Sequence, residues 1–155
     1  MSPDTQVLDS AQKIAEHRRE LERRSNDREI EFKKAQSSFF DTQREWQNKI
    51  NEAQGEIDKA TQKVEAWKSF VENQRHLASI PEEKVLARTA ALEKAVTDAK
   101  VKKNDLNAQA EVALRPLVEA VDRTGKEFNT AKKALDGLKE YESLFNEKPA
   151  EEAKP

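Results

Sequence analysis

Apolar residues recur along most of the chain at alternating steps of three and four positions. This spacing places them on one face of an α-helix and is typical of a coiled-coil seam. In the first half of the chain, the seam residues are Val7, Ala11, Ile14, Leu21, Phe32, Ala35, Phe39, Trp46, Ile50, Ala53, Ile57, Ala60, Val64, Trp67 and Val71. In the second half, they are Val85, Leu92, Val96, Ala99, Leu106, Ala110, Leu114, Leu117, Val121, Phe128, Ala131, Leu135, Leu138 and Phe145. The pattern therefore predicts two long helices.

A stop and a restart of this pattern occur together at mid-chain, around Pro81. Proline lacks a backbone N–H and disfavours the helical conformation of the residue before it, here Ile80. Ser79 followed three positions later by Glu82 has the spacing of a capping box, with the proline inside the first turn of a new helix. A connection this short returns the second helix along the first. We therefore predict an all-α fold: a long antiparallel two-helix coiled-coil hairpin with its turn near residues 77–81.

The predicted hairpin occupies residues 1–147 as a single domain. Its parts are a helix over 4–77, a turn over 78–81 and a helix over 82–146. The tail, residues 147–155, contains no large apolar residue and is predicted to be disordered. At 1.5 Å per residue, each arm would be on the order of 100 Å long.

Pro116 lies inside the second seam, where a proline removes one backbone hydrogen bond and kinks a helix. A turn there or at Gly125 would give a three-helix bundle instead. No cluster of loop residues surrounds the proline, and the apolar spacing continues through it, so two helices are favoured. Whether Pro116 only kinks the second helix or ends it stays open.

Both seams contain two consecutive four-residue steps, one around Trp46 and the other around Ala110. Such stutters locally unwind a left-handed supercoil. Trp46 and Ala113 lie at nearly equal distances from Ser79, so the stutters face each other if the chain folds back there. Small residues then oppose the large indole, which is the complementarity that a two-helix core requires.

The composition supports long helices, because the 155 residues are 37% charged and include only three Gly. Formal net charge is −2, and acidic and basic residues are interleaved, unlike the basic faces of nucleic-acid binders. No apolar run is long enough to span a membrane, and no secretory signal peptide is visible. The absence of cysteine fits a reducing compartment. We therefore expect a cytoplasmic protein with no membrane span and no nucleic-acid partner.

Candidate catalytic chemistry is missing from the sequence. The two histidines, His17 and His76, lie near opposite ends of one predicted helix and cannot share a metal within a monomer. Glycines are too few for a phosphate-binding loop, and a two-stranded rod offers no water-excluding pocket. We expect a protein that is not an enzyme, with no catalytic, cofactor-binding or metal-binding residues and no cofactor.

The seam is interrupted between Leu21 and Phe32, where polar residues occupy the core positions. The adjoining segment, residues 17–24, is the most basic patch of the chain. It is either a solvated helix end or a docking surface for an acidic partner. Phe40 and Phe70 fall beside the seam and are candidates for an exposed contact. The candidate partner-binding residues are Arg18, Arg19, Arg23, Arg24, Phe40 and Phe70.

These features favour a non-catalytic interaction protein, with a homo-oligomeric structural or assembly protein built from hairpins as the alternative. A nucleic-acid or membrane-surface binder fits worst, because the charges alternate rather than segregate. The architecture over Val7 to Phe145 resembles the stalk proteins of bacterial flagellar and virulence type III secretion systems. The resemblance implies a cytosolic adaptor whose paired ends enter the ring of an export ATPase and which contacts export-gate or chaperone partners. The residues that would meet the ring are Arg18, Arg19, Arg23 and Arg24, with the stretch Lys132 to Tyr141 opposite them.

Overall fold

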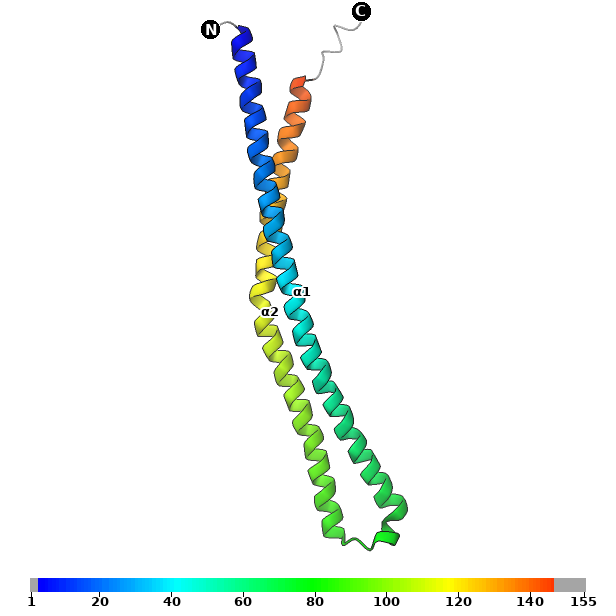
Figure 1. The fold of residues 1–155 in the computed structure, drawn as a ribbon. Coiled ribbons are helices and arrows are strands. Elements are labelled where there is room, and N and C mark those ends of the chain that lie inside the picture. The colour runs from blue at the N-terminus through cyan, green and yellow to red at the C-terminus, as the bar shows by residue number, and fades with distance from the viewer. Residues whose placement is uncertain (1–2, 147–155) are drawn as a thin grey trace, which may run out of the picture. The chain divides into compact units, whose positions relative to one another are not determined.

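The computed structural model is an all-α helical hairpin, in which two long helices pack against each other (Figure 1). Helix α1 spans Pro3–Ala78 and helix α2 spans Glu82–Asn146. The structure describes residues 3–146, so the tail predicted to be disordered, residues 147–155, lies outside the described residues. The predicted fold class is therefore confirmed.

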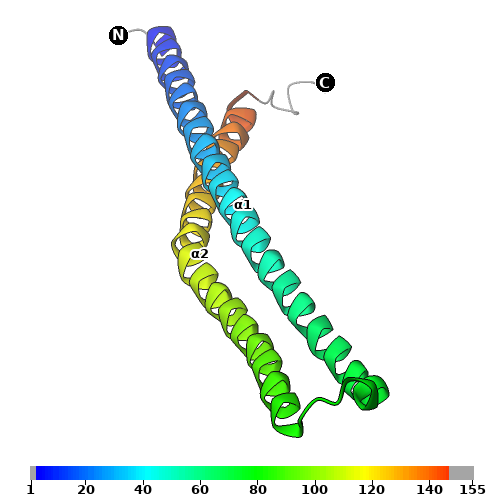
Figure 2. The same ribbon diagram turned by 60° about the horizontal axis from the view of Figure 1, so that its bottom comes forward.

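The hairpin divides into two compact units, each made of a stretch of both helices. The first, the loop unit, consists of Phe40–Pro116 and includes the connection between the helices. The second, the terminal unit, consists of the described residues up to Phe39 together with those from Leu117 onward. Within each unit, the stretch of α1 runs antiparallel to the stretch of α2, as Figures 1 and 2 both show.

In both units the predicted seam positions are shielded from solvent. Every seam residue whose side chain is described is buried or half-buried, except Ala11. The side chains of Val7 and Phe145 lie outside the described set. The buried apolar residues are Leu21, Ala53, Ile57, Val85, Leu92, Ala110, Ala131 and Leu135. Each helix thus contributes one stripe to a thin shared core.

Helix α2 continues through Pro116 without ending, so the three-helix alternative is wrong for the residues that the structure describes. The proline side chain is exposed, while Leu114 and Leu117 on either side of it are half-buried. Proline removes the hydrogen bond that would reach back to the carbonyl of Val112. We infer that seam packing on both sides of Pro116 offsets this loss. The boundary between the two units also falls at this residue.

The connection between the helices differs from its predicted form. Ser79 has a φ of 50° and follows α1 directly, so it is the left-handed residue that closes this helix. The carbonyl of Pro81 accepts the N–H groups of Lys84 at 3.0 Å and Val85 at 3.1 Å, and Glu82 is the first residue of α2. The predicted capping box starting at Ser79 is therefore wrong, because an N-cap residue has an extended backbone and directly precedes its helix. Pro81 occupies that place.

Replacing Ser79 by Gly is expected to raise the free energy of unfolding by about 1 kcal/mol. A non-glycine residue in the left-handed region bears a steric cost of about 1 kcal/mol, which glycine avoids. Urea unfolding followed by circular dichroism measures the change. The matched control is Ser38→Gly at an exposed position inside α1, where the same substitution should lower stability by about 0.5 kcal/mol. A loss of stability in both variants would contradict the assignment of Ser79.

Candidate interaction surface

The arginine segment, residues 17–24 of α1, lies in the terminal unit and is anchored to α2 by Arg18. The Arg18 guanidinium donates from Nη1 to Oε2 of Glu142 at 3.1 Å. The Glu142 side chain is only 16% exposed, so the ion pair is partly shielded from solvent. Arg18 occupies a seam position, and its charge is compensated by the neighbouring helix. Its main contribution is therefore to join the two helices, and it is a weaker candidate for binding an acidic partner.

The interruption of the apolar seam is filled by polar residues from both helices. Arg28 Nη1 donates to Oε2 of Glu127 across the helix pair at 3.0 Å. Ser25 and Thr124 are buried, and the Thr124 hydroxyl donates to the Ala120 carbonyl at 2.6 Å. Polar residues at seam positions fix the register of a helix pair at some cost in stability. This layer therefore specifies which residues of α1 and α2 lie opposite each other.

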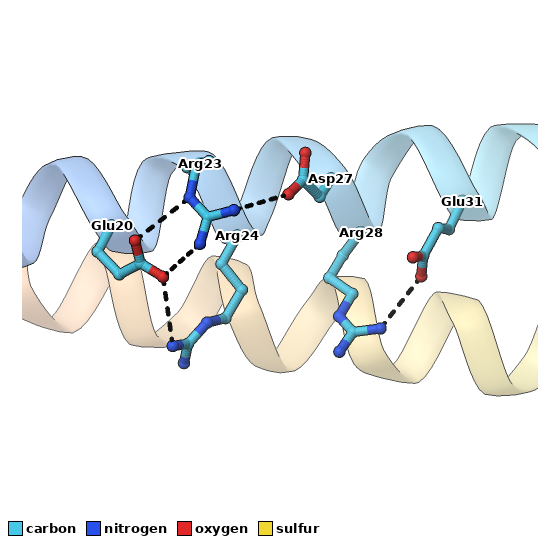
Figure 3. A network of polar contacts seen from close by, with 6 residues as sticks. All are labelled: Glu20, Arg23, Arg24, Asp27, Arg28 and Glu31. Carbon is cyan, nitrogen blue, oxygen red and sulfur yellow. Dashed lines mark hydrogen bonds and ion pairs between the residues drawn. The ribbon is translucent and has the colours of Figure 1, made fainter.

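Arg23 and Arg24 bind acids of their own helix, as Figure 3 shows. Arg23 donates to Glu20 twice, from Nη2 at 2.6 Å and from Nε at 3.2 Å, and lies 3.5 Å from Asp27. Arg24 Nη2 lies 3.8 Å from Oε1 of the same Glu20. Exposed pairs of this kind contribute little to stability, because water screens the charges. They leave both arginines available to a partner that offers better geometry.

The ion pair between Arg23 and Glu20 shifts the pKa values of both side chains. The hydrogen bond from Arg23, and next its positive charge, lower the pKa of the Glu20 carboxyl, with smaller contributions from Arg24 and His17. The same hydrogen bond and the Glu20 charge raise the pKa of Arg23. An acidic partner must therefore compete with Glu20 for Arg23. Arg19, in contrast, is exposed and makes no ion pair with any residue that the structure describes.

The two phenylalanine candidates lie in the loop unit and have different surroundings. The Phe70 ring is half-buried and stacks on Trp67, with ring centroids 6.0 Å apart at an interplanar angle of 20°. Trp67 Nε1 in turn donates to the Thr89 hydroxyl of α2 at 2.9 Å. Phe70 therefore supports the packing between the helices. Phe40 is 55% exposed and stays a candidate for a contact with a partner.

A shallow apolar groove of about 450 Å³ on the loop unit was not predicted from the sequence. Its lining includes Trp46 of α1 and Ala108, Val112 and Ala113 of α2, so Trp46 and Ala113 border the same groove. Val112 is exposed and does not occupy a seam position. Heptad spacing marks only the residues between two helices, so it gives no signal for apolar residues on their outer faces.

Among the described residues, no group of three or more His, Cys, Asp or Glu side chains is placed to hold a metal ion. No described helix is both long enough and apolar enough to cross a membrane. The chain matches no family model, no curated protein and no solved structure. Function must therefore be argued from the surface of the hairpin itself.

Proposed function

We propose that the chain is a non-catalytic coiled-coil interaction protein whose arginine segment docks on an acidic surface of a protein partner. The observation that carries this proposal is that the arginines of the segment differ in their contacts with α2. Arg18 is tied to α2 through Glu142, which holds this part of α1 in place. Arg19 and Arg23 are exposed, and neither bonds to α2. A rigid helix thus presents cations whose compensation is weak or absent.

The partner class follows from the resemblance to type III secretion stalk proteins. We propose an export ATPase ring or its associated chaperones, met in the cytoplasm by the terminal unit of the hairpin. Guanidinium groups bind carboxylates through two parallel hydrogen bonds, so an acidic rim is the surface that such a segment recognises. The bond between Arg18 and Glu142 supports this, because it brings the arginine segment beside the α2 stretch that the resemblance implies at the ring.

Reversing the charge of Arg19 and Arg23 to Glu is expected to weaken binding to a purified type III export ATPase at least tenfold. The variant loses two cations and places two acids against an acidic rim. Microscale thermophoresis at physiological ionic strength measures the dissociation constant. Arg18 is left unchanged, because a glutamate there would face Glu142.

The matched control reverses Lys34 and Arg44, two other exposed cations of α1. It carries the same change in net charge and should bind like the wild type. Equal weakening in both variants would reject the arginine segment as the contact. No binding by the wild type would reject the export ATPase as the partner.

A further inference from the structure

Helix α2 carries a second row of uncharged residues outside the seam. The row, called the outer row here, follows steps of four and three positions and consists of Thr130, Ala134, Gly137, Tyr141 and Leu144. All five residues are exposed, and the two large ones, Tyr141 and Leu144, are 55% and 63% exposed. A Cβ placed on Gly137 would meet no atom within 4 Å, so the row is open to solvent at its centre. This spacing is that of a coiled-coil face without a partner among the residues described.

The outer row is distinct from the face that binds α1. Four of its five members directly precede a seam residue; for example, Ala134 precedes the buried Leu135 and Gly137 precedes the half-buried Leu138. The fifth, Tyr141, precedes Glu142, the residue that binds Arg18 of α1. One residue corresponds to about 100° around a helix. The two faces of α2 are therefore roughly at right angles, which is the arrangement of a helix with two neighbours in a four-helix bundle.

We propose that the outer row binds the outer row of a second copy of this chain, with the two α2 helices antiparallel. An antiparallel pair with Ala134 opposite the partner copy's Gly137 also places Tyr141 opposite Thr130. The large Tyr141 side chain of each copy then lies against the smaller Thr130 of the other. The two copies therefore use the same surface for the contact. Such a contact closes as a symmetric dimer and does not extend into a filament.

Charge complementarity favours a second copy over a partner helix that carries charges of one sign only. Lys133 and Glu140 flank the outer row on its outer side, are exposed, and form no ion pair with any described residue. In the antiparallel register, Lys133 of each copy lies beside Glu140 of the other, so two identical ion pairs form. Since this flank carries both signs, a partner helix of uniformly acidic or basic character gains no comparable match.

The test is the mass of the full chain by light scattering across a dilution series, with the dissociation constant from analytical ultracentrifugation. The wild type should dimerise. Lys133→Glu and Glu140→Lys should each raise the dissociation constant about tenfold, because each puts like charges together at both ends of the contact. The double variant, Lys133→Glu with Glu140→Lys, restores both pairs and should recover dimerisation.

The control variants are Lys94→Glu and Glu111→Lys, which change exposed charges elsewhere on α2 and should leave the dimer unchanged. Circular dichroism confirms that each variant remains helical. A wild type that is monomeric at all concentrations would overturn the proposal, as would a dimer that the reversals do not affect. Self-pairing does not depend on the proposed function, but it covers part of the α2 stretch, Lys132 to Tyr141, that the resemblance implies at the ring. If the wild type is monomeric but still binds the export ATPase through Arg19 and Arg23, only the proposal of self-pairing is rejected.

Discussion

Replacing Leu92 by Asp is expected to lower the free energy of unfolding by about 4 kcal/mol. Leu92 belongs to the seam of the loop unit and is only 9% exposed. The substitution removes buried apolar area and leaves a carboxylate without a partner between two helices. A core only one stripe wide has no second layer of side chains to repack around the change. Urea unfolding followed at 222 nm measures the loss.

Leu86→Asp is the matched control for this prediction. Leu86 lies in the same helix, six positions earlier, and its side chain is 64% exposed. The same chemical change there should alter stability by less than about 0.5 kcal/mol. Equal losses in the two variants would mean that the seam does not run where the structure places it.

Replacing Phe32 by Ala is expected to cost about 3 kcal/mol, the second-largest effect. The Phe32 ring stacks on Phe128 of α2 with centroids 6.2 Å apart and an interplanar angle of 6°. It also lies over Gly125, where a Cβ would come within 2.9 Å of Cε2 of the ring. The absence of a side chain at Gly125 therefore makes room for the stacked pair. Thermal and urea unfolding of the variant measure the loss.

This arrangement predicts that Gly125→Ala changes the stability in opposite directions in the wild type and in the Phe32→Ala background. In the wild type, the new methyl group displaces the Phe32 ring, and stability should fall or stay unchanged. In the Phe32→Ala background, the space is free, and alanine should stabilise α2 by about 1 kcal/mol through its higher helix propensity. Gly55→Ala, where no atom lies within 4 Å of the added Cβ, should stabilise in both backgrounds. Stabilisation by Gly125→Ala in the wild type would contradict the close contact.

Much of the fold could be predicted from the sequence because it depends on periodicity. Alternating steps of three and four positions marked the residues that become the shared core, and the matching stutters around Trp46 and Ala110 indicated their register. Trp46 and Ala113 do line the same groove. Continuity of the apolar spacing through Pro116 was also informative, because packing on both sides outweighs one missing backbone hydrogen bond.

Other features could not be predicted, because they depend on specific contacts between the helices. The spacing of Ser79 and Glu82 suggested a capping box, but the positive φ of Ser79 is used to end α1. The arginine segment was predicted to be either a solvated helix end or a docking surface, and its bond to α2 could not be predicted because Glu142 lies 124 positions from Arg18 in the sequence. The outer row could not be predicted because three of its five members, Thr130, Ala134 and Gly137, are small residues that give little hydrophobic signal.

The short connection at Ser79 to Pro81 favours assembly of the hairpin from the connection outward. Cross-helix hydrogen bonds join residues 22 positions apart at Trp67 and Thr89, and 124 positions apart at Arg18 and Glu142. Closing the longer loop directly would cost about 1.5 kcal/mol more in chain entropy than closing the shorter one. If the helices pair first beside the connection and then progressively toward the chain ends, this cost is avoided. Each new contact then forms next to residues of α1 and α2 that are already paired. We therefore expect the folding rate of the hairpin to depend on nucleation beside the connection more than on the sequence separation of the contacts formed later, such as that of Arg18 with Glu142.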